Sequence, residues 1–473
     1  MSKYFKFKTA ESLARDAQGL GLDVRVTDDL SPLLTPISIG GRHVGNRMVI
    51  QPMEGCDGTA DGSPDELTYR RYERFGAGGA KLIWGEAAAV VPEGRANTRQ
   101  LVIDEAHLTG LARLLKECRQ AHRQAWGDDS DLLVGIQLTH SGRYSVPRPI
   151  LAQHDPVLDP RTIIDKTTGQ TANQATPLLS DDQLDQLQDS YVSAAKVGHQ
   201  AGFDFVDLKQ CHKYLLNELL ASKTRPGKYG GSYANRTRFI REVVAKIRDA
   251  VPDLIVATRM NIYDGIPYNQ GPNEGAGIPC DLNLPLLSTW GTREDDPQVA
   301  DLTEPIRLVG DLAAQGVSLF NLTLGNPYAN PHLLRPFEYA PTDAYQTPEH
   351  PLIGVDRHFR LTAEIQAAHP QVAIVGSGYS WLQAWMFHAG AANIRDGRVT
   401  LVGVGRGALS HPDFGGYVME GKPLDPKRTC RTFSDCTALM RSKHNPLGQF
   451  ATGCPPFDKA VYGPIFDEAM ATK

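Results

Sequence analysis

Residues 203–238 read FDFVDLKQCHKYLLNELLASKTRPGKYGGSYANRTR, and this stretch decides how the rest of the chain is interpreted. Its first six residues, 203–208, have the composition and the length of a short buried strand. Lys209, Cys211, His212 and Tyr214 follow at once, so ionisable groups gather at the carboxyl end of that strand. Substrates bind at this end in parallel sheets, whether open or closed. We therefore expect the chemistry of the protein here.

Short apolar runs alternate with helical segments along most of the chain. The alternation predicts parallel strands, and closing eight of them gives a (β/α)8 TIM barrel. An open, doubly wound sheet is the competing architecture, and the count of eight favours the barrel. The expected strands are 48–53, 81–87, 132–140, 203–209, 254–260, 318–323, 372–376 and 399–405. Expected helices include 65–74, 107–118, 181–197 and 236–249.

Three segments are longer than ordinary connections between such elements. Residues 144–180 and 262–300 follow the third and fifth strands, at the face where barrels build their specificity. The third segment follows the last strand. We therefore expect a barrel with its lead-in over residues 1–414 and a C-terminal extension over residues 415–473.

Composition narrows the class of protein. The chain has 473 residues and a formal net charge of −5, which gives no reason to expect nucleic acid or an anionic membrane as a partner. Seven cysteines, without a signal peptide or a long apolar run, predict a reducing, cytoplasmic setting rather than a disulfide framework.

The segments YLLNELL (214–220) and YGGSYANRTRF (229–239) resemble the Old Yellow Enzyme and 2,4-dienoyl-CoA reductase family of flavin oxidoreductases. The resemblance covers about Leu30 to Phe414. It implies a TIM barrel that binds FMN, is reduced by NADH or NADPH and passes a hydride from flavin N5 to an electron-poor C=C or a related acceptor. FMN is favoured over FAD because no GxGxxG unit with its acidic partner follows for an adenosine group. The family also suggests a homodimer.

The resemblance places residues of the flavin ring site at strand ends. Pro52 and Met53 match a pair beneath the ring, and Ala87 matches a small residue at its pyrimidine edge. Gln137 matches a glutamine that hydrogen-bonds a ring carbonyl and a ring nitrogen. Arg259 matches an arginine near N1, where its charge would stabilise the anionic reduced flavin. The whole cofactor set, including the phosphate site, is Pro52, Met53, Glu54, Ala87, Gln137, Arg259, Gly376, Ser377, Gly378, Gly405 and Arg406.

The phosphate part of that set lies after the seventh and eighth strands. Backbone N–H groups at residues 376–378 and 405, with the cation of Arg406, supply the donors that a phosphate needs. TIM barrels commonly bind phosphate at this position.

In the same family, a His-x-x-His or His-x-x-Asn pair after the fourth strand binds the activating oxygen of an unsaturated carbonyl. A tyrosine nearby delivers a proton to Cα. The matching residues here are Lys209, His212 and Tyr214, so the pair begins with lysine, and Lys213 stands where the family has glycine. These three are the expected catalytic residues.

The lysine has three interpretations. With His212 it would still polarise a carbonyl and would favour a more anionic acceptor, such as a carboxylate or an enolate. If buried, Lys209 could have a depressed pKa and act in proton transfer. In the third interpretation it pairs with Glu54, Glu86 or Asp207 and never touches substrate.

The extension carries a cysteine pattern that departs from the family. Relatives resembling dienoyl-CoA reductase have four cysteines there, written roughly C-x2-C-x3-C with a fourth further on, which hold an iron–sulfur cluster. Here Cys430, Cys436 and Cys454 stand at shifted spacing, and Phe433 occupies the place of the second ligand. We therefore expect neither an iron–sulfur cluster nor another metal. A zinc site of the three cysteines with His444, or a purely structural tail, stays open.

The leading expectation is thus an FMN-dependent NAD(P)H oxidoreductase acting on a small molecule, with Tyr214 as proton donor. One alternative within flavin chemistry is oxidation of an amine or another reduced substrate. An alternative of another class is a flavin-free lyase or aldolase in which Lys209 forms a Schiff base. The last alternative is a barrel that binds a partner without catalysing a reaction.

Overall fold

Eight parallel strands close into a barrel in the computed structural model, which describes residues 4–272, 275–342 and 344–471. Each strand pairs with the barrel strand before it in the chain, and β14 closes the ring on β3. The TIM barrel is confirmed, and each of the eight expected strands corresponds to one of these. They are β3 (Met48–Ile50), β4 (Leu82–Ala89), β5 (Leu133–Thr139), β8 (Phe205–Gln210), β9 (Ile255–Tyr263), β12 (Leu319–Leu324), β13 (Ala373–Gly376) and β14 (Leu401–Val404).

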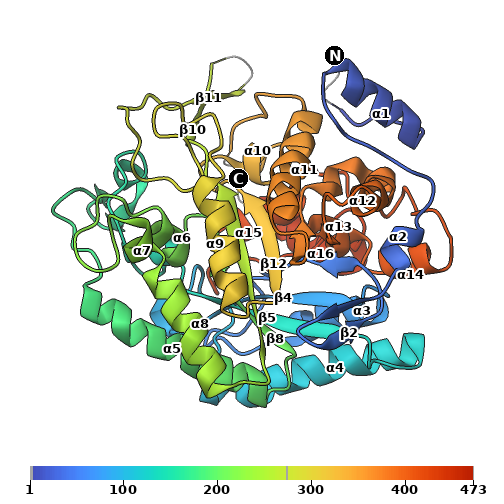
Figure 1. Cartoon of the computed structure of the whole chain (residues 1–473), viewed down its shortest axis with the longest axis horizontal. Coiled ribbons are helices and arrows are strands. Elements are labelled where there is room, and N and C mark those ends of the chain that lie inside the picture. Colours follow the sequence, from blue (N-terminus) through green and yellow to red (C-terminus); the bar gives the residue numbers. More distant parts are fainter. Residues whose placement is uncertain (1–3, 273–274, 343, 472–473) are drawn as a thin grey trace.

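Helices surround the barrel, and α4, α5 and α8 lie along one side of it (Figure 1). The four expected helices correspond to α3 (Glu66–Ala77), α4 (Leu108–Trp126), α5 (Asp181–Gln200) and α8 (Arg238–Ala250). The remaining α-helices before the extension are α1 (Ala10–Gly19), α2 (Ser31–Leu34), α6 (Leu215–Leu220), α7 (Tyr233–Arg236), α9 (Thr303–Ala314), α10 (Pro331–Leu334), α11 (Pro351–Ala368), α12 (Met386–Arg395) and α13 (Arg406–Ser410). Helix α14 (Phe414–Met419) spans the start of the extension.

Helix α5 shows how local sequence sets an element of this ring. Ser180 caps it by accepting a hydrogen bond from the backbone N–H of Gln183 (3.1 Å), and the Gln183 side chain accepts one from the backbone N–H of Ser180 (2.8 Å). This capping box satisfies two donors that a helix start otherwise leaves unpaired. Leu184, Leu187 and Tyr191 recur at helical spacing and are buried, so they hold α5 against the barrel.

Strand β8 shows the alternation that builds the barrel. Val206 and Leu208 belong to the core between strands and helices, whereas Phe205 belongs to a separate cluster inside the barrel. Asp207 and Lys209 follow Phe205 at every second position, so they share its face. The inward face of β8 therefore changes from aromatic to acidic to basic as the strand approaches its carboxyl end.

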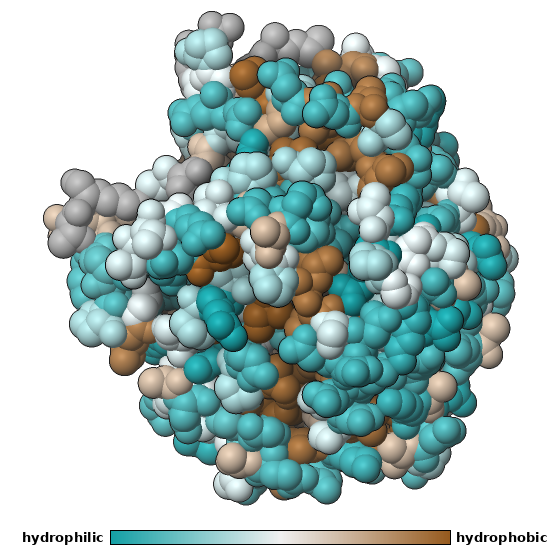
Figure 2. All heavy atoms as spheres, turned by 90° about the vertical axis from the view of Figure 1, so that its left-hand side faces the viewer, coloured by the Kyte–Doolittle hydropathy of each residue, from teal (hydrophilic) through white to brown (hydrophobic). Residues whose placement is uncertain are grey.

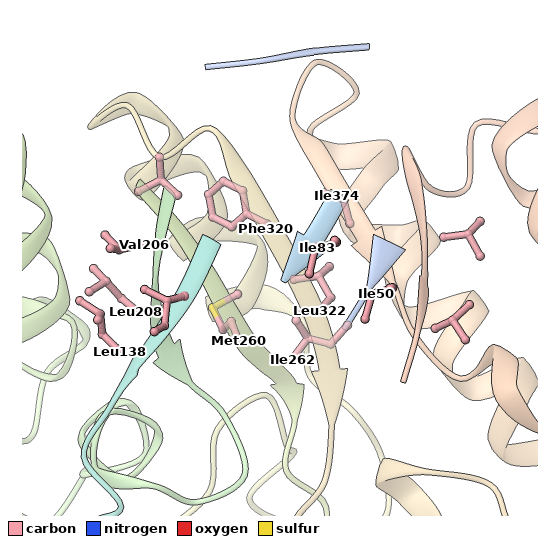
Figure 3. Packing of buried hydrophobic residues seen from close by; sticks show 14 of the residues in the cluster. Ile50, Ile83, Leu138, Val206, Leu208, Met260, Ile262, Phe320, Leu322 and Ile374 are labelled. Atoms are coloured by element: carbon pink, nitrogen blue, oxygen red, sulfur yellow. The ribbon is translucent and has the colours of Figure 1, made fainter. Parts of the chain in front are cut away.

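Two apolar cores result from this alternation across all eight strands. Figure 3 shows part of the outer core, including Ile50, Ile83, Leu138, Val206, Leu208, Met260, Ile262, Phe320, Leu322 and Ile374. The lower interior of the barrel is filled mainly by Val49, Leu82, Trp84, Leu133, Phe205, Ile255, Leu319, Val375 and Leu401.

The two long loops on the carboxyl face each contain a small hairpin. Residues 144–180 include β6 (Ile163–Asp165) with β7 (Gln170–Thr171), and residues 262–300 include β10 (Tyr268–Gln270) with β11 (Gly277–Pro279). Arg161 donates to the Asn269 side chain (2.8 Å) and so joins the two loops. The lead-in forms a further hairpin, β1 (Ile37–Ile39) with β2 (Arg42–Val44).

The extension folds back over the carboxyl face through α15 (Asp435–Arg441) and α16 (Lys459–Ala471). Asp458 accepts from Arg70 of α3 (2.7 Å), and the backbone N–H of Thr452 donates to the carbonyl of Gly55 (2.7 Å). A small core of its own holds the segment together, made of Leu439, Phe450, Ala451, Tyr462 and Ala469. The boundary expected after residue 414 stays a prediction.

Polar side chains cover most of the face that Figure 2 shows, with hydrophobic ones visible in a band through its middle. Within the described ranges, no helix has the length and apolar character needed to cross a membrane.

Candidate active site

A cavity of about 220 Å³ opens at the carboxyl end of the barrel, and residues in or just after all eight strands contribute to its wall. Every expected site residue lines it except Gly376, which ends β13. The structure therefore brings together the cofactor set and the catalytic set. The lining residues from the expected sets are Pro52, Met53, Glu54, Ala87, Gln137, Lys209, His212, Tyr214, Arg259, Ser377, Gly378, Gly405 and Arg406.

Asp207 organises the floor of the cavity. One of its carboxylate oxygens accepts from the Gln137 side chain and from the indole of Trp84, both at 2.6 Å. The other accepts from the backbone N–H of Arg259 at 2.5 Å. The Gln137 amide is thereby fixed, and its oxygen is left for a ligand. Sequence reasoning considered Asp207 only as a partner of Lys209 and missed this positioning role.

The Arg259 guanidinium is buried and only partly satisfied by the protein. One Nη donates to the carbonyl of Pro52 (3.3 Å), while Nε has no hydrogen-bond partner in the described structure. Burial lowers the pKa of Arg259 from its ordinary value. A buried cation with an open donor requires an acceptor from elsewhere.

In the expected phosphate region, some donors are already bonded within the protein and others are not. The Ser377 hydroxyl is already engaged, because it donates to the carbonyl of Leu322 (2.7 Å) and accepts from Gln51 (2.7 Å). The Arg406 side chain donates to the carbonyl of Pro336 (2.7 Å), and its other Nη is buried without a partner among the described residues. Gly405 lines the cavity, and a Cβ added there would make ordinary van der Waals contact with Gln51 (3.7 Å) and Met53 (3.8 Å).

Lys209 is buried at the end of β8, and its ammonium lies 3.8 Å from the centroid of the Tyr214 ring. Burial lowers the pKa of Lys209. In the described part of the chain, no carboxylate oxygen lies within 4.0 Å of the Lys209 ammonium, the distance that an ion pair requires. The interpretation in which Lys209 pairs with Glu54, Glu86 or Asp207 is therefore wrong.

The reason is that those carboxyl groups have other partners. Glu86 pairs with Arg71 at 2.5 Å, and Asp207 holds the three donors described above. Glu54 accepts from the Asn97 side chain, and burial raises its pKa to about 7.

His212 and Lys213 both adopt left-handed backbone conformations, with φ of 67° and 60°. Such conformations are uncommon outside glycine, which explains why the family places glycine at the second position. Lys213 is held there by Asp264 (3.1 Å) and Asp155 (3.8 Å). The turn directs His212 to the cavity, where its Nε2 is buried without a partner among the described residues. Burial, followed by the charge of Arg259, lowers the pKa of His212 well below its usual range, so the imidazole is neutral.

Tyr214 completes the substrate side of the cavity. It is buried, and its hydroxyl lies 3.3 Å from the hydroxyl of Tyr328. Burial raises the pKa of Tyr214 well above its usual value, so the phenol keeps its proton at neutral pH. Tyr328 in turn packs on Tyr144, with ring centroids 4.3 Å apart.

The extension forms part of the cavity wall, which the sequence did not reveal. Its Arg441 side chain donates to the carbonyl of Pro327 (2.7 Å) and lies 5.1 Å from the Tyr328 ring. Its Thr437 hydroxyl accepts from Arg335 (2.5 Å). The lining residues that the extension contributes are Cys436, Thr437, Met440, Arg441, Gln449 and Thr452. Other lining residues outside the expected sets include Gln51, Asn97, Thr323, Tyr328 and Arg335.

The three cysteines of the extension line a second, much smaller cavity of about 30 Å³, beside Arg406. Burial raises the pKa of the Cys430 and Cys454 thiols. Across the described ranges, no group of three or more His, Cys, Asp or Glu side chains is arranged to hold a metal ion.

Comparison with known proteins agrees with this geometry. The family described as NADH:flavin oxidoreductase / NADH oxidase matches residues 32–279. The chain belongs to that family. An NADPH dehydrogenase of Clostridium acetobutylicum is 31% identical over 211 residues, which are 44% of this chain and 57% of that protein. The match thus spans less than two thirds of this relative.

Solved structures share the fold at low identity. A 2-naphthoyl-CoA reductase in complex with 2-naphthoyl-CoA superposes with a TM-score of 0.65 at 19% identity, over 93% of this chain and 58% of that one. The Old Yellow Enzyme homologue of Zymomonas mobilis gives a TM-score of 0.58 at 19% identity, over 84% and 94% of the two chains. The Old Yellow Enzyme-like barrel is therefore shown.

Proposed function

We propose that the chain is an FMN-dependent oxidoreductase that takes reducing equivalents from NADH or NADPH and delivers a hydride to an electron-poor C=C or a related acceptor. One observation carries this proposal. The expected ring-binding residues and the expected catalytic residues line the same cavity, among them Gln137, Arg259, His212 and Tyr214.

The donors in the cavity fit FMN. Arg259 and Arg406 each have a buried nitrogen that no described residue accepts from, and an anionic ligand with two separate acceptor regions would satisfy both. Gly405 and Arg406 both line the cavity, so a phosphate bound there would reach the backbone N–H groups next to Arg406. The hydroxyl of Ser377, already bonded on both sides, would leave phosphate contact there to the backbone.

The residues of this chain would divide the work as follows. FMN, when bound, would supply the hydride carrier between nicotinamide and acceptor. Gln137, fixed by Asp207, and Arg259 would hold the ring. The neutral His212 would donate from its free ring nitrogen to the acceptor's activating oxygen. Tyr214, kept protonated by burial, would give its proton to Cα of the acceptor.

The Tyr214→Phe variant tests this division. Protein loaded with FMN is reduced anaerobically with NADPH or NADH and then mixed with 2-cyclohexen-1-one, and both steps are followed by flavin absorbance. Reduction should keep its wild-type rate, because no proton from Tyr214 is needed. Reoxidation should slow by about 10²- to 10⁴-fold.

Tyr328→Phe is the matched control, since it removes the neighbouring hydroxyl but leaves the proton of Tyr214 in place. Equal reoxidation rates in the wild type and Tyr214→Phe would contradict the assignment of the proton donor. Bleaching by an amine without nicotinamide would instead favour the oxidative alternative. A colourless protein that borohydride traps on a carbonyl substrate would favour Schiff-base chemistry at Lys209.

A further inference from the structure

Within the described part of the chain, no carboxylate pairs with the amino group of Lys209 at ion-pair distance, and Glu54 and Asp207 act on its pKa only from farther away. Lys209 is only 5% exposed, and its ammonium lies over the face of the Tyr214 ring. A charged group loses its hydration on burial and is normally compensated by an opposite charge and hydrogen bonds. The aromatic face compensates only part of that loss. The remaining ammonium hydrogens point to a ligand.

The ammonium faces the cavity rather than the packed core. Lys209 lines the cavity together with His212 and Tyr214, and its inward position follows from the alternation along β8. The neighbouring residue on the same face, Asp207, is saturated by its three donors, so it cannot turn to neutralise the lysine.

The charges around the cavity favour an anion as well. Among the described lining residues, Glu54 is the one carboxyl group. Cationic side chains predominate, and clefts lined by one sign of charge concentrate ligands of the opposite sign. The cationic lining residues are Lys209, Arg259, Arg335, Arg406 and Arg441.

The proposed cofactor does not use all of this positive charge. If Arg259 serves the ring and Arg406 serves the phosphate, Lys209 stays available on the substrate side, next to the proton donor. Arg335 and Arg441 are anchored to Thr437 and to the carbonyl of Pro327, and contribute to the field at the mouth.

We infer that the acceptor carries an ionised carboxylate, bound by Lys209 beside His212, so that the substrate class is α,β-unsaturated carboxylates rather than neutral enones. This inference rests on the proposed function for the place of the cofactor. A carboxylate at Lys209 supplies the missing counter-charge and accepts from the ammonium and from the imidazole. Its Cα then lies on the side of Tyr214, whose ring contacts the same ammonium.

A pair of probes of equal size tests the inference. Binding of trans-cinnamate and of trans-cinnamamide to the FMN-loaded wild type is measured by isothermal titration calorimetry at pH 7. Because a hydrogen bond to a charged group is stronger than one between neutral groups, the carboxylate should bind about tenfold or more tightly than the amide. Equal affinity, or tighter binding of the amide, would overturn the inference.

Variants assign the preference to one residue. Lys209→Met keeps the length of the side chain without its charge and should reduce the ratio of the two affinities to about one, while Lys209→Arg should retain it. Lys246→Met, at an exposed lysine of α8, is the matched control and should leave the ratio unchanged. A preference that survives in Lys209→Met would also overturn the inference.

The two proposals fail in different ways. Loss of the flavin spectrum, or flavin that neither nicotinamide reduces, contradicts the proposed function and is recorded on the same preparation before any probe is added. The cinnamate-to-cinnamamide ratio is a binding measurement that needs no turnover. If Lys209→Met does not fold, the wild-type ratio alone decides the inference.

Discussion

The lower half of the barrel interior, at the amino ends of the strands, and the upper half, at their carboxyl ends, are built from the same strands. They differ in polarity. The lower half is apolar, and Phe205 and Leu319 pack there without polar atoms to satisfy. Two residues further along each strand, Asp207 and Asn321 begin a polar layer. Above it, Lys209 and Thr323 reach the cavity, and the Thr323 hydroxyl has no partner among the described residues.

The difference separates what stabilises the fold from what awaits a ligand. Apolar burial in the lower half lowers the free energy of the folded chain without any partner. Buried polar groups left unsatisfied in the upper half cost free energy until a ligand pairs with them. Substitutions in the lower half should therefore change stability, and substitutions in the upper half should change ligand binding.

The largest expected effect is in the lower half. Phe205→Ala removes a fully buried ring that packs edge-on against Trp84, with centroids 5.1 Å apart. The free energy of unfolding should fall by about 3–5 kcal/mol, because the cavity left behind adds to the lost transfer free energy. Urea denaturation of the apoprotein measures this loss.

Thr323→Val is the matched control for Phe205→Ala, at the upper end of β12, which β9 separates from β8. It removes an unpartnered hydroxyl at nearly constant volume, so the unfolding free energy should stay the same or rise. A loss of stability at Thr323 as large as that at Phe205 would break the comparison.

The next effect is in the upper half. Arg259→Met should weaken FMN binding about 10- to 100-fold, the value of a lost hydrogen bond from a charged donor. The apoprotein should not lose stability, since the guanidinium has a single long hydrogen bond within the protein. Titration of the apoprotein with FMN, followed by quenching of flavin fluorescence, gives the affinity.

Arg143→Met provides the contrast for Arg259→Met. Arg143 is equally buried but is paired with Glu218 (2.6 Å) and Asp159 (2.7 Å), outside the cavity. Breaking these pairs should cost about 3–5 kcal/mol of stability. FMN affinity of the molecules that remain folded should not change, and a parallel loss of affinity in both variants would contradict the separation.

The third effect is a pH dependence at Glu54. Burial raises its folded pKa to about 7, so folding favours the protonated form, and stability falls as pH rises from the unfolded value of 4.5 through 7. Glu54→Gln removes this penalty. The variant should gain about 2–3 kcal/mol relative to the wild type between pH 5 and pH 8. Thermal unfolding of both proteins at the two pH values measures this gain. If the stability difference between variant and wild type is the same at pH 5 and pH 8, the pKa of Glu54 is not raised.

The fold could be predicted almost completely because buried strands and amphipathic helices have different periods in sequence. Gln137 and Arg259 were expected in the site because the resemblance to the family places them there, and Lys209 because it follows an apolar run. The contribution of the extension could not be predicted. Arg441 approaches Tyr328 only because the chain folds back over the barrel, and no periodicity in either segment encodes that meeting.

The sequence predicted which residues line the cavity better than it predicted their hydrogen bonds. The residues expected at the cavity reach it, but the Ser377 hydroxyl is taken by Gln51 and Leu322 rather than left for a phosphate. The state of Lys209 likewise depends on which carboxylates its neighbours have already occupied. Such competition is decided by three-dimensional distances of a few ångströms, which residue types at strand ends do not specify.

The visible absorption spectrum of the purified protein, recorded before and after anaerobic addition of NADPH and then of NADH, tests the central claim most directly. The account predicts a flavin band that one of the two nucleotides bleaches, and restoration of that band from colourless apoprotein by added FMN. A protein without a flavin band that binds no added FMN would contradict the account.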